Sequence, residues 1–413
     1  MAFHSERIYQ YFQERGIGLI NLPLPDCYKG QDAVKRLAER IAEDGCRHPL
    51  IVCGKTVTKH GLTDRFQTEL SGLGIRYTVW DGAIPNPTVA NVEEGRTVYL
   101  QADCDSVVVF GGGSSMDCGK LVAARAANPD IPVEKMQGSM RLRKKPCPIY
   151  AIPTTAGTGS EATLAAVVIE EESHHKYAVN DPRLIPAACA LDAALTVSVP
   201  PAVTGQTGMD ALTHAVEAYT NIYGLKNAYS YAKSAVCTIL NHIEAAYDDG
   251  SVIKNREKML MGSFKAGAAF TRNCVGYVHA IGHPLSGFYG LPHGEVMAAL
   301  LPLLMKKYVS AVTRPLAELF DAAADAQAAG SRGNASLLNT DRTSLTESDK
   351  ASLFIDEIVR LDRKFGIPEK FDCIREEDIA AMTAYAAAEA KGYPTPVILS
   401  ADEIAEIYRK LME

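Results

Sequence analysis

Short apolar runs rich in valine and isoleucine recur through the first half of the chain and then stop. They are separated by segments with helical spacing and occupy residues 50–53, 76–80, 106–110, 148–152, 165–170 and 187–192. Buried strands that alternate with crossover helices predict an α/β layer on a mostly parallel sheet. After Pro200-Pro201 the chain is rich in alanine and leucine with helical spacing, which predicts an all-helical second half. We therefore expect two domains, residues 1–199 and residues 200–413.

Charge and hydropathy argue against two classes of partner. The 413 residues carry 42 Lys+Arg and 49 Asp+Glu, a net charge of −7 without a basic tract, so we expect no nucleic acid partner. The chain has no run of 18 apolar residues, so we expect no membrane span. The ten cysteines form no CxxC pair and the N-terminus lacks the apolar core of a signal peptide, which is typical of a soluble cytoplasmic protein.

Two segments lie outside the periodic pattern. The first twenty residues fit either an oligomerisation arm or an ordered leader, and the sequence does not decide between them. Residues 326–350 are expected to form a long exposed connection, whose end at Thr346 to Asp349 caps the next helix.

A glycine-rich segment directly follows the apolar run at 106–110. It reads Gly111, Gly112, Gly113, Ser114 and Ser115, and a helical pattern follows it. Glycines allow close approach of the backbone, and the free amides and dipole of a helix N-terminus favour an anion. The spacing is neither the GxGxxG of a standard dinucleotide fold nor a Walker loop. This glycine loop (Gly111–Ser115) indicates a phosphate cradle, although a plain tight turn has the same sequence.

A second polar segment, Thr154–Glu161, follows the apolar run at 148–152. Its hydroxyl groups and glycines suit hydrogen bonds to a phosphate, a ribose or an amide, and the alternative is a turn that only caps the next helix. Both loops follow predicted parallel strands, and open α/β sheets bind ligands at the carboxyl ends of their strands. Together the glycine loop and this threonine loop (Thr154–Glu161) favour a dinucleotide over a lone phosphate.

Four of the ten histidines fall in two short segments of the second half, together with one carboxylate. Asp210 and His214 are spaced i,i+4, as are His279 and His283, and His293 follows them. On a helix this spacing places both side chains on one face. Mixed imidazole and carboxylate donors suit Fe²⁺, Zn²⁺ or Mn²⁺ rather than Mg²⁺ or Ca²⁺. The spacing does not say which three histidines bind the metal and which one is left as a proton carrier.

These motifs together resemble the iron-containing alcohol dehydrogenases, whose superfamily also includes glycerol dehydrogenase and dehydroquinate synthase. The resemblance covers nearly the whole chain: residues 81–88 are similar to the family's DGxxPNPT stretch, residues 111–117 to its GGGSxxD and residues 154–161 to its TTAGTGSE. Residues 208–214 and 276–294 are similar to its C-terminal signatures. The resemblance implies the dehydroquinate synthase-like fold, with an α/β dinucleotide-binding domain and an all-α metal-binding domain. It also implies a homodimer or a higher homo-oligomer.

The resemblance further implies roles for individual residues. The metal ligands would be Asp210, His214, His279 and His293, with Fe²⁺ as the ion and Zn²⁺ as the alternative. His283 would be catalytic and lie beside the substrate and the nicotinamide. The cofactor contacts would come from Gly54, Asn86, Gly111, Gly112, Gly113, Ser114, Ser115, Thr154, Thr155, Thr158 and Lys176.

One of these positions departs from some relatives. They carry an Asp directly after the first strand, where it accepts hydrogen bonds from the adenosine ribose and repels a 2′-phosphate. This chain has Gly54 there, followed by Lys55. Losing the carboxylate removes that repulsion and leaves Lys55 or Lys59 to pair with a phosphate. We therefore expect NAD or NADP as the cofactor, without a preference.

The expected reaction is reversible hydride transfer between a small alcohol, or the matching aldehyde or ketone, and NAD(P), with a divalent metal polarising the substrate oxygen. A zinc-dependent glycerol or polyol dehydrogenase is one alternative, but that group uses three protein ligands where this chain offers four. A dehydroquinate-synthase-like lyase is another, but its sugar-phosphate substrate needs Lys and Arg, which residues 208–219 and 275–294 lack. By their closeness to the motifs, four features are candidates for lining the substrate cleft, although core packing is expected for each: Phe270, Phe288, Tyr289 and the Gly392–Pro394 turn.

Overall fold

A computed structural model of the chain describes residues 22–172, 175–328 and 340–412, and positions 7, 10, 16, 18 and 20 before them. The chain divides into two compact units. The helical unit comprises Met1–Asn21, Pro200–Gly250 and Met261–Glu413, and the α/β unit comprises Leu22–Val199 and Ser251–Leu260. The change after Val199 falls where Pro201 begins a helix, a position that tolerates the missing N–H of proline.

The α/β unit is built on a six-stranded sheet in the order β1-β9-β6-β4-β2-β3, in which every neighbouring pair is parallel. Four of its strands are buried along their whole length. Continuous apolar runs are what such strands require, because helices cover both faces of a parallel sheet. The strands are β1 (Asp26–Lys29), β2 (Pro49–Val52), β3 (Thr78–Trp80), β4 (Ser106–Gly111), β6 (Ile149–Pro153) and β9 (Ala188–Leu191). The predicted α/β layer on a parallel sheet is confirmed.

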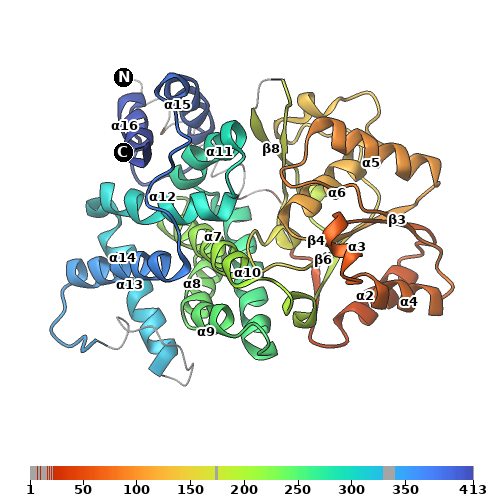
Figure 1. Ribbon diagram of the computed structural model, residues 1–413, viewed down its shortest axis with the longest axis horizontal. Helices are drawn as coiled ribbons and strands as arrows, with labels where there is room; N and C mark the ends of the chain where they lie inside the picture. Colours follow the sequence, from red (N-terminus) through yellow and green to blue (C-terminus); the bar gives the residue numbers. More distant parts are fainter. Residues whose placement is uncertain are drawn as a thin grey trace. The chain divides into compact units, whose positions relative to one another are not determined.

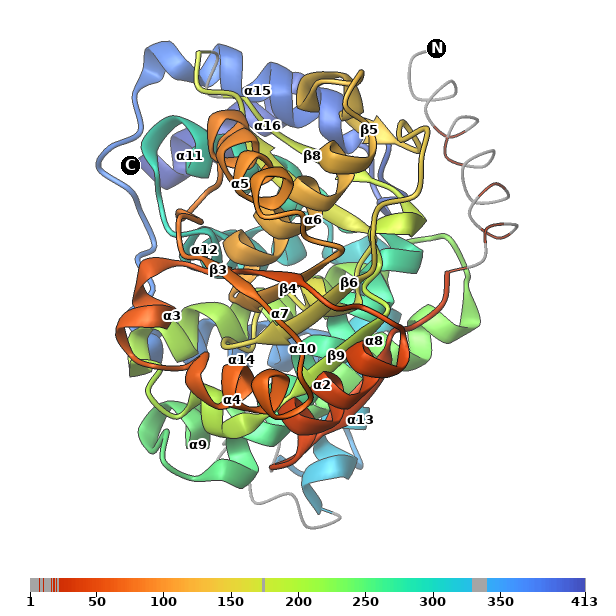
Figure 2. The same cartoon turned by 90° about the vertical axis from the view of Figure 1, so that its right-hand side faces the viewer.

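Helices pack on both faces of this sheet, as Figures 1 and 2 show. One face carries α2 (Ala33–Glu43) and α4 (Asp64–Gly72), and the other carries α5 (Val89–Gln101) and α6 (Gly113–Ala127). On the first face the core joins Leu37 and Phe66 from the helices to Phe110 from the sheet. A short helix, α3 (Lys55–Lys59), follows β2 directly.

One predicted strand lies elsewhere. Residues 165–170 were expected in the parallel sheet, but β7 (Ala165–Ile169) pairs antiparallel with β8 (Lys176–Asn180) in a separate three-stranded sheet with β5 (Gly138–Ser139). Every second residue of β7 is buried and the others are half-buried, as in a strand with one solvated face. Short 3-10 helices complete the unit: η1 (Val133–Met136), η2 (Ser160–Ala162), η3 (Pro182–Leu184) and η4 (Ala193–Thr196).

Every helix or strand that the structure describes after Pro200 is an α-helix, which confirms the predicted helical half. The helices are α7 (Pro201–Thr220), α8 (Lys226–Leu240), α9 (Ile243–Asp248), α10 (Ile253–Asn273), α11 (Tyr277–Tyr289), α12 (His293–Lys307), α13 (Val309–Ala328), α14 (Glu347–Phe365), α15 (Glu376–Ala390) and α16 (Ala401–Met412). Helix α7 packs against α8 and α12, and α11 packs against α12 and α15.

The expected connection at 326–350 is described only at its two ends. Helix α13 continues to Ala328, and residues 329–339 lie outside the described part of the chain. The predicted cap is confirmed: the Asp349 amide donates to Thr346 Oγ1 at 3.2 Å, and the Thr346 amide donates to Asp349 Oδ2 at 2.9 Å. This reciprocal capping box starts α14.

Within the described residues, no one helix has both the length and the apolar composition to cross a membrane. Helices α12 and α13 meet those criteria only when taken together, and they are bent by 115° at their junction.

Candidate functional site

The glycine loop and the threonine loop begin at the same edge of the sheet. Strands β4 and β6 are neighbours in register, with Gly111 opposite Pro153. The amide of Thr154 donates to the carbonyl oxygen of Gly111 at 3.0 Å, which continues the pairing into the loops. This edge carries the carboxyl ends of the parallel strands, where open α/β sheets bind ligands.

Two glycines of the first loop allow the second loop to approach closely. A Cβ on Gly113 would lie 2.5 Å from Cγ2 of Thr158, and a Cβ on Gly112 would lie 3.1 Å from Oγ1 of Thr155. Gly112 is also the N-cap of α6, and it supplies no side-chain hydrogen bond to the first turn of the helix. The uncapped helix N-terminus and the adjacent threonine hydroxyls suit the pyrophosphate of a dinucleotide.

Three further residues named from the sequence are linked to one another. The amide of Asn86 donates to Ser114 Oγ at 3.1 Å, and Lys176 Nζ donates to Asn86 Oδ1 at 3.1 Å. Asn86 has φ 51°, a left-handed conformation that asparagine tolerates better than most residues. Gly54 follows β2 at the same edge and forms a bridge with Gly82. The structure therefore gathers the predicted cofactor residues at the carboxyl edge of the sheet and at the start of β8.

A buried lysine without a signal in the sequence holds the end of the threonine loop and the residues that follow it. Lys120 Nζ, on α6, donates to the carbonyl oxygens of Ser160, Thr163 and Ala165 at 2.7, 2.8 and 3.0 Å. Burial lowers the pKa of Lys120 to about 8, against the opposing effect of nearby carboxylates. A lysine in a helical pattern normally indicates a solvated face, so the sequence carries no signal for this role.

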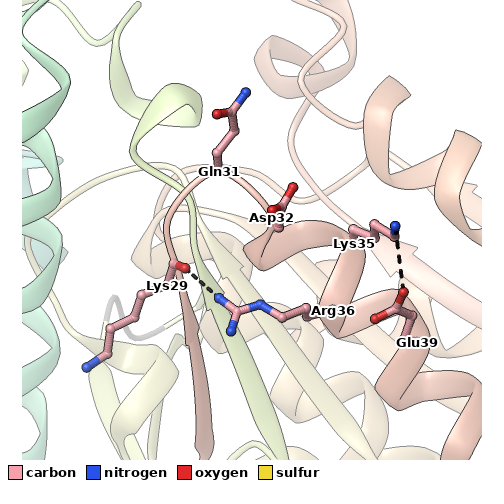
Figure 3. A pocket seen from close by; sticks show the side chains of 6 residues that line it. All are labelled: Lys29, Gln31, Asp32, Lys35, Arg36 and Glu39. Carbon is pink, nitrogen blue, oxygen red and sulfur yellow. Dashed lines mark hydrogen bonds and ion pairs between the residues drawn. The ribbon is translucent and has the colours of Figure 1, made fainter.

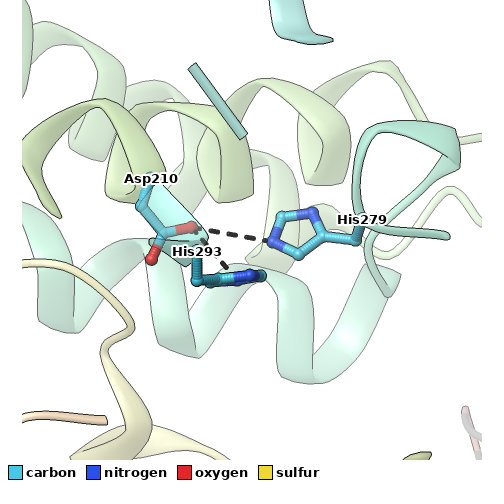
Figure 4. Close-up of side chains that lie close together, drawn as sticks. All are labelled: Asp210, His279 and His293. Atoms are coloured by element: carbon cyan, nitrogen blue, oxygen red, sulfur yellow. Dashed lines mark ion pairs between the residues drawn. The ribbon is translucent and has the colours of Figure 1, made fainter. Parts of the chain in front are cut away.

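In the helical unit, three of the predicted metal ligands converge (Figure 4). Nε2 of His293 lies 3.6 Å and Nε2 of His279 lies 3.8 Å from Oδ1 of Asp210. One donor atom from each of the three residues lies within 4.8 Å of the others. They come from α12, α11 and α7, and a Cβ at Gly294 would lie 2.4 Å from the carbonyl oxygen of Gln206. Glycine after His293 therefore lets the start of α12 reach α7.

His214 borders this cluster without belonging to the set of three. Its Nδ1 lies 3.9 Å from Asp210 Oδ1, and its ring stacks on His279 at 4.4 Å between centroids. Phe270, for which core packing is expected, stacks its ring on that of His214, with 4.4 Å between the ring centroids. Burial, followed by the charges of His279 and His283, lowers the pKa of His214 well below its usual value. His214 is therefore a neutral imidazole with a lone pair at neutral pH.

This donor set fits a divalent transition metal. Imidazole nitrogens and carboxylate oxygens bind Zn²⁺ at about 2.0–2.2 Å, so two donors of one ion are separated by about 3–4 Å. The distances from Asp210 Oδ1 to the nitrogens of the two converging histidines lie in that range. Fe²⁺ and Zn²⁺ both accept this combination of ligands.

A second residue missed by the sequence analysis orients one of these ligands. Glu217 is buried on α7, and its Oε2 lies 2.6 Å from Nδ1 of His279 while its Oε1 accepts from the Val278 amide at 2.7 Å. A partner on Nδ1 leaves Nε2 directed at Asp210 and the candidate metal position between them. A signal was present: Asp210, His214 and Glu217 recur at spacings of four and three, which is one face of a helix.

His283 lies beside the cluster, one turn after His279 on α11. Its ring stacks on His293 at 5.4 Å, and its Nδ1 lies 2.7 Å from Glu389 Oε1. Tyr393, in the turn expected to serve core packing, donates its hydroxyl to the same Glu389 oxygen at 2.5 Å. Tyr393 therefore belongs to the polar surroundings of His283, while Pro394 of the same turn is buried as expected.

The structure also has a pocket away from these residues, where β1 meets α2 (Figure 3). Arg36 donates to the carbonyl oxygen of Lys29 at 2.5 Å, and Lys35 pairs with Glu39 at 4.0 Å. Its volume is about 380 Å³, and its lining is made of Lys29, Gln31, Asp32, Lys35, Arg36 and Glu39. No residue predicted to bind cofactor, metal or substrate lines it.

Comparisons with known proteins agree with both halves of this description. The family profile "Iron-containing alcohol dehydrogenase" matches residues 25–193, and "Fe-containing alcohol dehydrogenase family, C-terminal" matches residues 204–412. Alcohol dehydrogenase 4 of Schizosaccharomyces pombe is 33% identical over 93% of this chain and 86% of its own length. NAD-dependent methanol dehydrogenase of Bacillus methanolicus is 30% identical over 93% of this chain and 97% of its own length. A solved structure of 1,3-propanediol oxidoreductase has a TM-score of 0.87 and 32% identity, and covers 95% of this chain and 100% of that one.

The contact between Glu217 and His279 generates a prediction. Replacing Glu217 by Gln should weaken Fe²⁺ or Zn²⁺ binding about 10- to 100-fold, because the imidazole loses the carboxylate that orients it. Competition with a chromogenic chelator measures the affinity. Glu357→Gln, which alters a buried glutamate on α14 that pairs with Arg360, is the matched control. Equal affinity in the two variants would contradict the role of Glu217.

Proposed function

Because the chain belongs to the iron-containing alcohol dehydrogenase family, we propose that it transfers hydride reversibly between a small alcohol and NAD(P). The observation that carries the proposal is the convergence of Asp210, His279 and His293 inside the helical unit. The glycine and threonine loops at the sheet edge bind the cofactor for the same reaction.

Each group of residues has one task in this proposal. Asp210, His214, His279 and His293 hold the ion, and the glycine loop binds the pyrophosphate. When bound, the ion supplies a Lewis acid for the substrate oxygen and the nicotinamide supplies or accepts the hydride. His283, held by Glu389 at Nδ1, takes or returns the alcohol proton.

We propose short primary alcohols and their aldehydes as substrates, with secondary alcohols and ketones next. Relatives named for alcohol, methanol and 1,3-propanediol support this range. A glycerol or polyol dehydrogenase is the second candidate, and the same substrate panel separates the two.

We also propose a homodimer or a higher homo-oligomer in the cytoplasm. The ten free cysteines, five of them buried, support a reducing compartment. Light scattering of the purified chain measures the oligomeric state.

The function is tested with purified protein stripped of metal and reloaded with Fe²⁺ or Zn²⁺. Absorbance at 340 nm with a panel of small alcohols and aldehydes should change steadily with at least one ion, and removing the ion should reduce the rate at least about 100-fold. Elemental analysis gives the metal content. Protein that binds neither ion and stays inactive with every substrate would overturn the proposal.

His283→Ala should lower kcat about 10²- to 10⁴-fold, the range for loss of a general acid–base group, while the metal content stays near that of wild type. Metal analysis and steady-state rates measure the two effects. Loss of metal in proportion to activity would instead make His283 a ligand.

Gly54→Asp tests the cofactor assignment. We propose that the chain accepts NADP as well as NAD, because Gly54 places no carboxylate at the end of β2. An Asp there would repel the 2′-phosphate, so the KM for NADPH should rise about tenfold or more, equivalent to ~1.4 kcal/mol, while the KM for NADH falls or stays constant. Gly54 has extended backbone (φ −96°, ψ 157°) that Asp also adopts. Gly72→Asp, at an exposed position of α4, adds the same charge elsewhere as a control.

A further inference from the structure

A chain of hydrogen bonds leads away from His283, and its first link is Glu389. Glu389 lies on α15, 106 residues after His283, and its Oε1 is 2.7 Å from the Nδ1 atom of His283. Burial raises the pKa of Glu389, but His283 and the hydroxyl of Tyr393 outweigh it and the net shift is downward. An ionised carboxylate only accepts hydrogen bonds, so it holds a proton on Nδ1 and leaves Nε2 as the exchanging nitrogen.

The second link is Tyr393, in the turn that follows α15. Its hydroxyl donates at 2.5 Å to the same Glu389 oxygen that faces His283. The turn is closed by the Thr395 amide, which donates to the carbonyl oxygen of Tyr393 at 2.9 Å. The direction of the Glu389 carboxylate therefore depends on where this turn holds Tyr393.

The third link comes from the N-terminal segment. Arg7 donates to the carbonyl oxygens of Thr395 and Pro396 at 2.6 and 2.9 Å, and Gln10 donates to that of Tyr393 at 2.7 Å. Arg7 also donates to Gln10 Oε1 at 2.9 Å, and Gln10 is 2% exposed. These two side chains bind three carbonyl groups of one short turn. We call Arg7 and Gln10 the clamp; both precede residue 25, where the match to the family profile begins.

We propose that Glu389 and Tyr393 are positioning residues for His283, and that Arg7 and Gln10 hold the turn that sets their geometry. This inference rests on the proposed function, in which His283 carries the proton. It assigns Arg7 and Gln10 a role in the orientation of the proton carrier.

A double-mutant cycle tests the link between Glu389 and His283. Glu389→Ala should lower kcat about 10- to 100-fold, part of the contribution of a general acid–base group, with KM and metal content within about twofold of wild type. In a His283→Ala background the same change should lower kcat by less than about twofold, because the group that Glu389 positions is absent. If Glu389→Ala lowered kcat by the same factor in the wild-type and His283→Ala backgrounds, the proposal would be overturned.

Tyr393→Phe tests the second link with a smaller change. It should lower kcat about three- to tenfold and leave the metal content unchanged, since the hydroxyl acts only through Glu389. Tyr219→Phe is the matched control, because Tyr219 donates at 2.7 Å to Glu318 in the same unit. Equal kcat in the two variants would remove Tyr393 from the chain of contacts.

The clamp is tested on the full chain without metal by hydrogen exchange, read by mass spectrometry. In the double variant Arg7→Ala/Gln10→Ala, amides of residues 391–400 should exchange at least about tenfold faster, and after metal loading kcat should fall three- to tenfold. Arg342→Ala, which removes another contact to a main-chain carbonyl, is the control. Unchanged exchange would show that the clamp does not hold the turn, and faster exchange with wild-type kcat would show that the turn does not position His283. If wild type lacks alcohol activity with either ion, the proposed function fails, whereas the exchange result still decides the clamp.

Discussion

Imidazoles packed around one buried carboxylate are the constraint on which the helical unit depends. Burial and neighbouring charges push the pKa of His214 well below its usual value, so this ring disfavours a positive charge. Such groups are costly inside a protein unless they share a ligand or hydrogen bonds. The placement of α7, α11 and α12 serves this requirement, because each helix delivers donors to one point and Glu217 fixes the ring of His279 from behind.

The sequence predicted the fold best where a strand is buried on both faces. β2, β4, β6 and β9 are continuous apolar runs because helices cover both sides of the sheet. β1 and β8 were missed because part of each strand is solvated and the apolar signal is interrupted. β7 was found but placed in the wrong sheet, since its partner β8 follows it directly in the chain and pairs antiparallel. Which strands pair is a tertiary property that a single run does not encode.

Some residues of the candidate site could also be predicted from the sequence, and others could not. Four metal ligands, Asp210, His214, His279 and His293, could be predicted because metal ligation restricts residue type and helices restrict spacing, and the structure brings donor atoms of three of them within 4.8 Å of one another. Lys120 and Glu389 were not identified, because each acts on a segment 40 or more residues away and looks like an ordinary surface residue in sequence. Core packing is expected for Tyr393 because aromatic residues usually pack there. Its hydrogen bond to Glu389 depends on how the turn folds back on α15, which the sequence does not show. Roles that depend on the packing of distant helices therefore stayed hidden.

Besides the hydroxyl groups of Ser160 and Thr163, the ammonium of Lys120 binds the main-chain carbonyl oxygens of Ser160, at the end of the threonine loop, and of Thr163 and Ala165 after it. Those oxygen atoms are present whatever side chains the loop carries. Substitutions at the half-buried Thr155 and Thr158 can therefore change ligand preference while the three carbonyl contacts remain. The carbonyl contacts that hold this segment and the hydroxyl groups that face away from Lys120 therefore lie on different atoms, which leaves selection free to change the second while keeping the first.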